Sequence, residues 1–586
     1  MKKTIIIALL FLFFNFSFSL SHAQQEEIYN ESVLVKGSFR PVIEQAEKIN
    51  FPAVMTDTMT RFEHTFQYSI SPTRLKSLYN PSRIKAARIL GEPATKLYNN
   101  YFRFGLGNYW SPLADLYWSS TRDREKTYGV RINHRSSWGS LPDYGKNHFG
   151  LTDVTLFGKY IVADKLQLST DLNYEHDHNL YYGFTDDMLQ TVLGKDRDDI
   201  SVKDYAASYN VASWNIGLRN MELDVNKLGY AADVHLSDLW TVWGANELNF
   251  TLAGDIHYGF PLLSDRKGVA YLHFEWEHYR NVSPGDGIAN FLGINGSAIR
   301  HSYTDHTNLL RVNPYVDFLF RGLNIHAGFL YGWDGYSAAG TNKHNYFYPD
   351  VMVSKKLMND NLALSLAATG GLEANTLNSL RMVNPYIDPD FEPGVVTSHY
   401  DFIGHARWTI SRKLEANAEV SYSLREGDLT FTLNPLYTLN NVYRAVFNDL
   451  NRLTVGADIA FVNDEMLTLR AGGHYYHYHI TDDTEPAWSD YYRPDWDFLA
   501  SADVNYNDRW LFHLEGRLLA KMQGDNNEEL PMRYGINASV EYRHNRALSF
   551  FLLLDNLAFQ RYYYWANYPS QKGLFILGLS YTIPHK

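Results

Sequence analysis

A two-residue alternation of apolar and polar side chains recurs along most of this chain. Between residues 575 and 583, every odd-numbered residue is Phe, Leu, Tyr or Ile, whereas the even-numbered residues are mostly small or polar. Because successive side chains of a β-strand point to opposite faces, this stretch is predicted to be a strand with one apolar and one polar face. The same pattern recurs at 166–174, 270–277, 414–422, 453–461, 498–506, 510–518 and 534–542.

The apolar faces of these strands need a covering that the rest of the sequence does not supply. Segments with a helical three-to-four-residue period, long enough to coat so many strands, are missing from the sequence. A backbone in lipid must satisfy all its hydrogen bonds internally, and only a closed sheet does so. We therefore predict an all-β fold, a large antiparallel transmembrane β-barrel whose apolar face contacts lipid and whose polar face lines a wet interior.

Connection lengths predict the orientation of the barrel. Bacterial barrels of this kind have short periplasmic turns, long extracellular loops and an even number of strands. Reading 425–450 as an outer loop rather than as an extra pair of strands gives about 22 strands. The predicted periplasmic turns lie at 163–165, 321–322, 411–413, 463–465, 507–508 and 544–546, and two of the predicted outer loops lie at 281–304 and 480–492.

Composition agrees with a barrel and excludes several classes of function. Aromatic residues make up 15% of the chain, as expected for a barrel with aromatic girdles at both membrane interfaces. The formal net charge of -12 gives no basic footprint, so no nucleic-acid partner is predicted. The chain has no cysteine, which excludes disulfides, zinc ribbons and thiol nucleophiles. The sequence predicts no cofactor and no metal site.

The N-terminal sequence predicts that the chain is exported. Residues 1–23 combine Lys2 and Lys3, an apolar stretch over 5–20 and a small-x-small cleavage motif that ends at Ala23, the three parts of a secretory signal peptide. The predicted domains are therefore the signal peptide 1–23, a short periplasmic or lumen-filling segment 24–95 and the barrel 96–586. A secreted barrel is predicted to lie in the outer membrane of a Gram-negative cell, surrounded by outer-membrane lipid.

The C-terminal stretch resembles a known family. FLLLDNLAFQRYYYWANYPSQKGLFILGLSYTI, residues 551–583, resembles the end of TonB-dependent receptors in the order and spacing of its Asn-Leu strand end, Tyr-rich loop, Tyr-Pro pair and final LGLSY strand. LREGDLTFTLNP at 424–435 and VYRAVFND at 442–449 are similar to an outer loop of that family. The resemblance covers 96–586 and implies an outer-membrane receptor or transporter that binds or imports a solute.

The same resemblance implies a plug and an energising partner. The family carries an N-terminal plug inside the barrel, whereas only 24–95 precedes the first predicted strand here, so a full plug is predicted to be absent. The lumen is instead predicted to be filled by 24–95, helped by outer loops that fold inward. Residues 31–41 resemble the segment by which the family docks to a periplasmic TonB-type protein through strand addition, although an ordinary strand or linker fits equally well. The implied docking residues are Ser32, Val33, Leu34, Val35, Lys36 and Gly37.

Charged residues of both signs fall on the polar face of the predicted strands. They would form either a path for a solute or a mutually neutralising surface that holds a filler segment. The second interpretation is favoured, because mixed signs steer neither anions nor cations strongly. The predicted lumen-lining residues are Arg407, Glu415, Glu419, Asp458, Arg470, Asp503, His513, Glu515, Arg517, Arg533, Glu541 and Arg543.

Two other functions stay open. The barrel could be a non-transporting accessory subunit of an assembly, secretion or surface-lipoprotein complex, with a surface lipoprotein or other envelope subunits as partners. His134-Arg135-Ser136 is similar to the His-x-Ser of outer-membrane lipid A deacylases, and alternation places His134 and Ser136 on the outward face, where an activated hydroxyl could attack a lipid ester. Because a second such tripeptide begins at His235, the pattern is expected by chance, and we predict that the protein is not an enzyme.

Overall fold

The computed structural model describes residues 99–583, except for 121–122, 124, 223–225, 264–265, 286–291, 294–303, 336–344, 392–393, 464–465, 482–490 and 526–527. The predicted signal peptide 1–23, the segment 24–95 and the docking residues 32–37 lie outside the described residues. They stay predictions.

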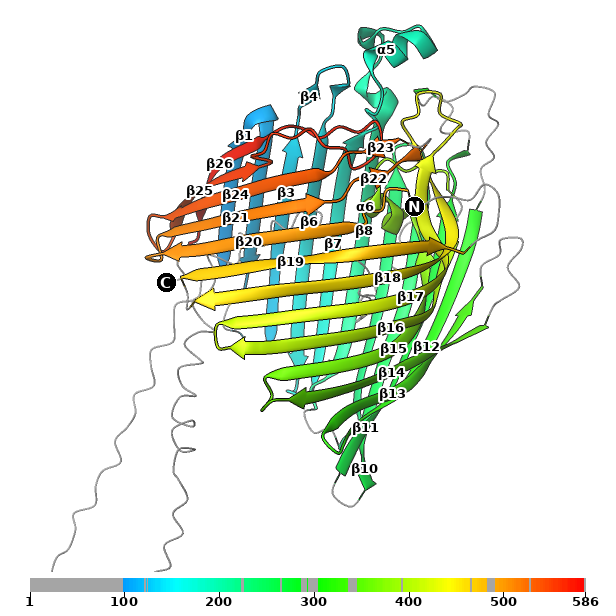
Figure 1. Cartoon of the computed structure of the whole chain (residues 1–586), viewed down its shortest axis with the longest axis vertical. Coiled ribbons are helices and arrows are strands. Elements are labelled where there is room, and N and C mark those ends of the chain that lie inside the picture. Colours follow the sequence, from blue (N-terminus) through cyan, green and yellow to red (C-terminus); the bar gives the residue numbers. More distant parts are fainter. Residues whose placement is uncertain are drawn as a thin grey trace, which may run out of the picture. The chain divides into compact units, whose positions relative to one another are not determined.

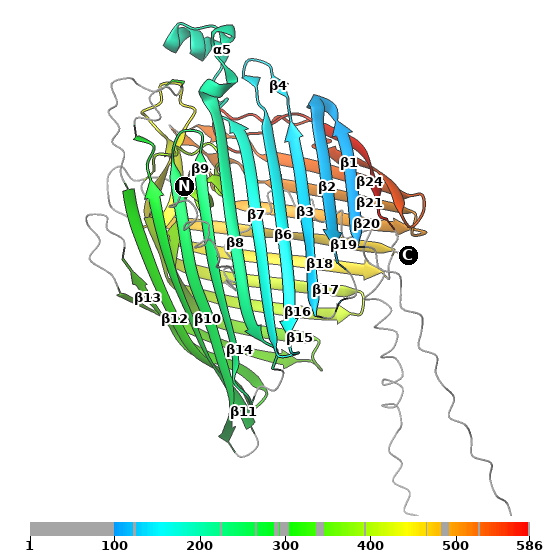
Figure 2. The ribbon, with the colours of Figure 1, turned by 180° about the vertical axis from the view of Figure 1, so that it is seen from behind.

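One closed antiparallel barrel of 22 strands accounts for most of the described chain (Figures 1 and 2). Each strand pairs with the next one along the sequence, and β1 pairs with β26 to close the ring. The predicted all-β class and strand number are confirmed. The strands are β1 Asn100–Gly107, β2 Ser111–Ser119, β3 Lys126–Ser137, β6 Phe149–Val162, β7 Leu166–Leu180, β8 Ala206–Asn220, β9 Gly229–Thr241, β10 Asn246–Leu263, β11 Arg266–Val282, β12 Thr304–Phe320, β13 Leu323–Asp334, β14 Asn345–Leu357, β15 Leu362–Asn375, β16 Gly394–Ser411, β17 Leu414–Leu433, β18 Tyr443–Asn463, β19 Leu467–Ile480, β20 Trp496–Tyr506, β21 Trp510–Leu519, β24 Arg533–Arg543, β25 Leu548–Asp555 and β26 Leu574–Tyr581.

Small elements decorate the longer connections. Two hairpins are built from β4 and β5 and from β22 and β23. Within the described residues, no helix is long and apolar enough to cross a membrane. The bounds are β4 Ser140–Leu141, β5 Gly145–Lys146, β22 Met522–Gln523, β23 Glu529–Leu530, α5 Asp186–Met188, α6 Leu377–Val383, the 3-10 turns η2 Asn108–Trp110, η4 Arg197–Asp199 and η5 Val202–Tyr205, and the π-helical turn η3 Leu189–Leu193.

The connections gather at two ends of the barrel, as predicted. One end, the turn end, carries short connections such as 163–165, 321–322 and 507–509. The other end, the loop end, carries long ones, of which 181–205 and 556–573 are examples. By the usual rule for such barrels, the loop end is the extracellular one.

The outer loop predicted over 425–450 is wrong in extent, although no extra pair of strands is present. β17 continues to Leu433 and β18 begins at Tyr443, so the connection is only 434–442. The two strands stay paired across a bulge between Arg425 and Asp428, where Gly427 takes a left-handed φ of 70°. The bulge shifts the register, and it is the reason why alternation failed to predict these strand ends.

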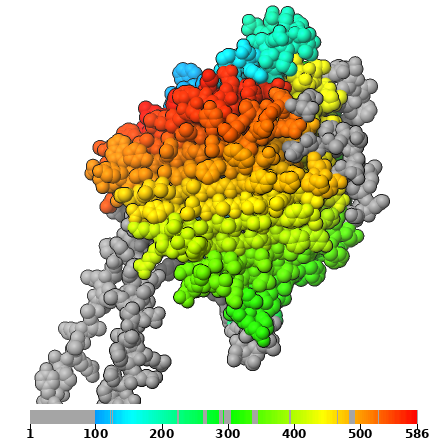
Figure 3. Space-filling model, in the orientation of Figure 1, coloured from blue at the N-terminus to red at the C-terminus, as the bar shows by residue number. Residues whose placement is uncertain are grey.

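The outward face of the strands is apolar and the inward face is mainly polar. On β26, Leu577, Leu579 and Tyr581 are 67%, 43% and 41% exposed, whereas Ile576 and Ser580 are 0% and 6% exposed. Figure 3 shows the side chains of β14 to β26 as a continuous outer surface. Because the exposed large apolar side chains recur on strands around the ring, this surface suits hydrocarbon rather than water.

Candidate functional site: the loop-end lid and the inward face

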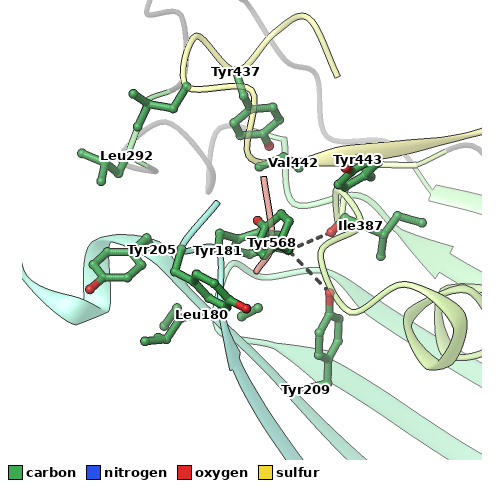
Figure 4. Close-up of a cluster of buried hydrophobic side chains, with 14 of the residues drawn as sticks. Leu180, Tyr181, Tyr205, Tyr209, Leu292, Ile387, Tyr437, Val442, Tyr443 and Tyr568 are labelled. Carbon is green, nitrogen blue, oxygen red and sulfur yellow. Dashed lines mark hydrogen bonds between the residues drawn. The ribbon is translucent and has the colours of Figure 1, made fainter. Parts of the chain in front are cut away.

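Long connections at the loop end share one buried core, which we call the lid (Figure 4). The lid is formed by 181–205, 376–391, 434–442 and 556–573, which pack against the upper ends of the neighbouring strands. Its centre is rich in tyrosine. The fully buried members drawn in Figure 4 include Tyr181, Ile387, Tyr437, Val442 and Tyr443, each at most 1% exposed. The loops therefore pack on one another.

Tyrosine hydroxyls tie one loop of the lid to the next. The Tyr181 hydroxyl donates to the Ile387 carbonyl at 2.7 Å, and the Tyr182 hydroxyl donates to the Pro569 carbonyl at 2.9 Å. In return, the Asn441 side-chain amide donates to the Tyr181 carbonyl at 3.0 Å. Buried carbonyls that water cannot reach need such partners. Burial raises the pKa of Tyr181 and of Tyr182 well above the ordinary tyrosine value of 10.0, so both remain neutral donors.

A buried carboxylate joins two of the loops at their centre. Asp388 is 0% exposed and accepts hydrogen bonds from the Asn434 amide at 2.6 Å and from the Tyr437 hydroxyl at 3.1 Å. Its backbone N–H donates to the Tyr443 carbonyl at 2.6 Å, beside a parallel bridge between Ile387 and Tyr443. Connection 376–391 is thus joined to connection 434–442 by side-chain bonds and to the first residue of β18 by backbone bonds.

Helix α6 fixes the lid to the barrel wall. The Arg381 guanidinium, whose side chain is 3% exposed, bonds to the Glu175 carboxylate at 2.6 Å and to the Asp177 carboxylate at 3.2 Å, both on β7. The N-terminal turn of α6 is capped by the Thr376 side chain, and the Leu377 N–H donates to the Glu247 carboxylate on β10. These charge-assisted bonds attach one loop of the lid to two separate strands.

Several of the predicted lumen-lining residues meet in ion pairs. Arg407 Nε lies 2.8 Å from Glu415 Oε1. Asp503 accepts from His513 Nδ1 at 2.8 Å and lies 3.4 Å from Arg470. All five residues are on the face opposite to the exposed apolar side chains. The arrangement is that of a mutually neutralising surface.

The remaining predicted lining residues have other surroundings. Asp458 accepts from the Asn417 amide at 2.9 Å, and Arg533 stacks 3.9 Å from the ring centroid of Tyr564. Arg543 lies 3.6 Å from Glu541. The structure does not bring these residues together as one site. Glu419, Glu515 and Arg517 occupy the same inward face as the others.

The opposite part of the inward face carries mostly carboxylates, which the sequence reasoning missed. Among the side chains described on β6 to β14, its basic residues are Lys159, Arg219, Arg311 and Lys356. The sequence did hold a signal of this acidic surface, because acidic residues occupy alternate positions in strands such as 270–277. We call the following residues the acidic wall: Asp153, Asp171, Glu175, Asp177, Asp233, Glu247, Asp255, Glu275, Glu277, Asp317 and Asp350.

The acidic wall is only partly neutralised by its own neighbours. Arg311 pairs with Glu275 at 3.2 Å and with Glu277 at 3.0 Å. Arg131 of β3 pairs with Asp153 at 3.2 Å, and Arg381 of the lid pairs with Glu175 and Asp177. His273 Nδ1 lies 2.8 Å from Asp255, and an imidazole carries charge only when it is protonated. The acidic wall therefore differs from the mutually neutralising surface on β16 to β24.

The His-x-Ser tripeptide forms a hydrogen-bonded pair that is poorly suited to catalysis. His134 Nε2 lies 3.1 Å from Ser136 Oγ, and His134 Nδ1 lies 2.8 Å from the Thr152 hydroxyl. Both residues lie on the same face of β3 as Tyr128, which is 50% exposed, and this is the outward face, as predicted. However, Ser136 is only 5% exposed, and a hydroxyl rather than a carboxylate orients the imidazole. At the second tripeptide, His235 bonds to Asn215 at 3.0 Å.

Together, the closed ring, the apolar outer surface and the folded loops define a large transmembrane β-barrel of the outer-membrane type. No family model matches the chain, and no curated protein matches its sequence. Solved structures do match its fold. The ferric-catecholate import receptor Fiu of E. coli K12, in its closed form, superposes with a TM-score of 0.59 at 12% identity, over 83% of this chain and 82% of that one.

Two further solved structures are similar to the same extent. The siderophore receptor PirA of Acinetobacter baumannii gives a TM-score of 0.59 at 9% identity, over 84% of this chain and 81% of that one. The FrpB iron transporter of Neisseria meningitidis gives 0.60 at 10% identity, over 84% and 82%. At such identities the likeness establishes the fold, and it agrees with the large barrel predicted from the sequence.

Proposed function

We propose that this protein is an outer-membrane receptor and transporter of a Gram-negative cell, which binds or imports a solute through a lumen that the lid closes. The observation that carries the proposal is the lid itself, because its loops pack into one core at the loop end, as a gate requires. The similar solved structures are named as import receptors and as an iron transporter, which supports the same class.

Passage of a solute requires the lid to open. Opening would break the tyrosine and Asp388 bonds between loops and would expose the apolar core to water. A ligand can supply this free energy only if it binds the open form more tightly than the closed form. Work from a periplasmic partner is the other source, and residues 32–37 are the proposed docking segment for a TonB-type protein.

Ferric siderophores are the first solutes to test, because the similar structures are named for ferric-catecholate and siderophore recognition. A strain without its own siderophore receptors would carry either the intact chain or the variant Val33→Pro/Val35→Pro. Proline removes the N–H groups that strand addition needs. We expect radioactive iron uptake with the intact chain and its loss with the variant, at equal barrel abundance.

The matched control is Val33→Ile/Val35→Ile, which keeps the strand-forming character of the segment. Uptake by the proline variant at the intact rate would contradict energised transport through this segment. Absence of uptake with every ferric siderophore, together with a stoichiometric set of co-purified envelope proteins, would instead favour the accessory-subunit alternative.

A further inference from the structure

Three arginine side chains gather on the inward face in the loop-end half of the barrel, and we call them the arginine cluster. Arg425 lies on β17, Arg452 lies on β18, and Arg493 precedes β20. In the strand register, Arg452 is opposite Ser423, two residues before Arg425, and opposite Tyr478 of β19. The Arg493 guanidinium lies 5.3 Å from the centre of the Tyr478 ring. The three side chains therefore converge on one part of the inner wall.

A single carboxylate forms ion pairs with the arginine cluster. Asp428 lies 3.0 Å from the Arg425 guanidinium and 2.6 Å from the Arg493 guanidinium. By contrast, on the mutually neutralising surface, Arg407 and Arg470 each have a carboxylate of their own. Three positive charges of the cluster thus share one negative partner.

Three further carboxylates near the cluster are each bonded to another group. The pairs are Glu426 with the His399 imidazole at 2.7 Å, Asp449 with the Gly427 N–H at 2.9 Å and Asp525 with the Tyr492 hydroxyl at 2.7 Å. Within the described residues, none of the three lies at ion-pair distance from a guanidinium of the cluster.

Arg452 is the member of the cluster that lacks a partner. In the described part of the chain, no hydrogen bond or ion pair reaches its guanidinium, and its Nε atom is buried. The Nε atom of Arg425 is also buried without an acceptor. Buried guanidinium groups without acceptors are costly. Since Arg452 alternates with the outward-facing Val455, which is 41% exposed, an acceptor can reach it from the interior of the barrel.

The cluster is held in place by its attachment to the lid. The Arg493 guanidinium donates to the Leu429 carbonyl at 2.6 Å and to the Thr430 hydroxyl at 3.0 Å. Leu429 in turn packs against the buried core of the lid. Because these bonds fix the donors in advance, little ordering is needed when a ligand binds.

We propose that the arginine cluster binds an oxyanion group of the solute, a carboxylate or a phosphate, with Arg452 as the principal donor. A guanidinium presents paired N–H donors that match both of these groups. The inference rests on the proposed transport function and narrows its substrate class to anionic solutes. The acidic wall on β6 to β14 would repel such a solute and so favour its binding on the side of β17 to β19.

Equilibrium dialysis of the purified full-length protein in detergent tests the proposal without any transport. The probes are radioactive inorganic phosphate and, in a parallel series, radioactive citrate as a carboxylate, at about 0.01 M salt to limit screening. We expect saturable binding of at least one probe at one site per barrel, and the probe that binds identifies the group. In Arg452→Gln the affinity should fall about tenfold, the loss expected for one charge-assisted hydrogen bond.

Matched variants separate this site from a general effect of charge. Arg407→Gln and Arg470→Gln each remove one positive charge from the mutually neutralising surface and should leave the affinity unchanged. Arg452→Lys keeps the charge without the paired donors and should recover part of the lost affinity. The heat-sensitive mobility of the unboiled protein in SDS gels shows that each barrel is folded.

Absence of saturable binding of both probes to the intact protein would overturn the proposal. Unchanged affinity in Arg452→Gln, or an equal loss in Arg407→Gln, would overturn it as well. Uptake measurements keep the two proposals apart. If a probe binds as expected but no solute is imported, the oxyanion site stands and the transport function fails, whereas import without oxyanion binding would leave transport standing and remove the site.

Discussion

A few buried polar side chains hold the loop end together. Arg381 is an extreme case, because its charge is almost wholly removed from water and depends on the carboxylates of Glu175 and Asp177. Removing one partner of such a group leaves the others buried and uncompensated. The orientation of α6, and with it the loop 376–391, therefore depends on Arg381 as well as on the bond from the Leu377 N–H to Glu247.

Replacing this side chain tests that dependence. Arg381→Met keeps much of the volume but removes the charge, so Glu175 and Asp177 lose their partner, and the closed lid should be destabilised by about 3 kcal/mol. We expect amide hydrogens of α6 to exchange much faster in the variant, measured by hydrogen–deuterium exchange and mass spectrometry. Met382→Ala is the control, because Met382 is 64% exposed. Unchanged exchange in Arg381→Met would refute the role of the ion pairs.

Replacing Gly427 tests whether the bulge of β17 requires a residue without a side chain. A Cβ atom there would lie 2.9 Å from the Val395 carbonyl oxygen, and the φ of 70° is unfavourable for any side chain. Gly427→Ala should therefore lower the stability by about 1 to 3 kcal/mol. The measurement is the thermal unfolding midpoint in detergent. The control Gly404→Ala meets only ordinary contacts, with Leu366 at 3.5 Å, and should unfold like the intact protein. Equal midpoints for both variants would contradict the strain.

At the scale of elements, the lid is an assembly of loops whose tyrosines must stay neutral. Tyr181, Tyr182, Tyr386 and Tyr568 all lie in connections, and burial raises the pKa of each above the ordinary 10.0. A pKa that is raised in the closed form means that closure of the lid favours the protonated tyrosine hydroxyl over the phenolate. This contribution is complete below pH 10 and is lost as the pH rises towards the pKa of the closed lid.

Alkaline pH should accordingly open the lid before the barrel unfolds. We expect the lid tyrosines to ionise later than exposed ones, in a cooperative step above pH 10 at which the lid loops lose protection from hydrogen exchange. Absorbance at the phenolate band gives the ionisation, and mobility in SDS gels reports the intact barrel. Tyr181→Phe/Tyr182→Phe removes two of the titrating groups and should make the step shallower. A single ionisation step at pH 10 for all tyrosines would contradict a buried lid.

Much of the barrel was predictable, because alternation is a local signal. Residues 575–583 show which face of β26 meets lipid without any knowledge of its neighbours. The upper parts of β17 and β18 were not predictable, because there Thr430 and Thr432 are buried in the described structure at 2% and 5% exposure, so their polar character does not mark a loop. In the same way, Tyr-rich connections are visible in the sequence, but the bond from Tyr182 to Pro569 depends on long-range closure.

The charged inward face was predictable in kind but not in arrangement. Alternation placed Arg407 and Glu415 on one face, but their pairing depends on the register between β16 and β17. The acidic wall needed the complete ring, because its members come from separate strands between β6 and β14. Individually, residues such as Asp233 or Asp317 look like ordinary polar positions of a strand. Their common sign becomes informative only once the strands are set side by side.

At the scale of the whole molecule, a ring of 22 strands encloses an interior that must be closed to protect the cell. At the loop end, the loops of the lid share one buried core, and we propose that they form one barrier. Residues 24–95, which lie outside the described residues, are the filler predicted from the sequence. If both are present, they act as two barriers in series, and ions cross only when both have been removed.

Planar lipid bilayers distinguish one barrier from two. We expect the intact protein, the variant that lacks 24–95 and the lid variant Arg381→Met/Asp388→Ala all to be almost silent, because each keeps at least one barrier. The combined variant should show stepwise conductance in the nanosiemens range or just below it, as expected for a barrel of this width.

The same recordings give the ion selectivity. Because carboxylates dominate one wall of the open lumen, the current should be carried mainly by cations, and neutralising Asp255 and Asp317 should reduce that preference. Steady conductance after removal of 24–95 alone would show that the lid does not seal, whereas conductance of the lid variant alone would show that the N-terminal segment leaves the lumen open.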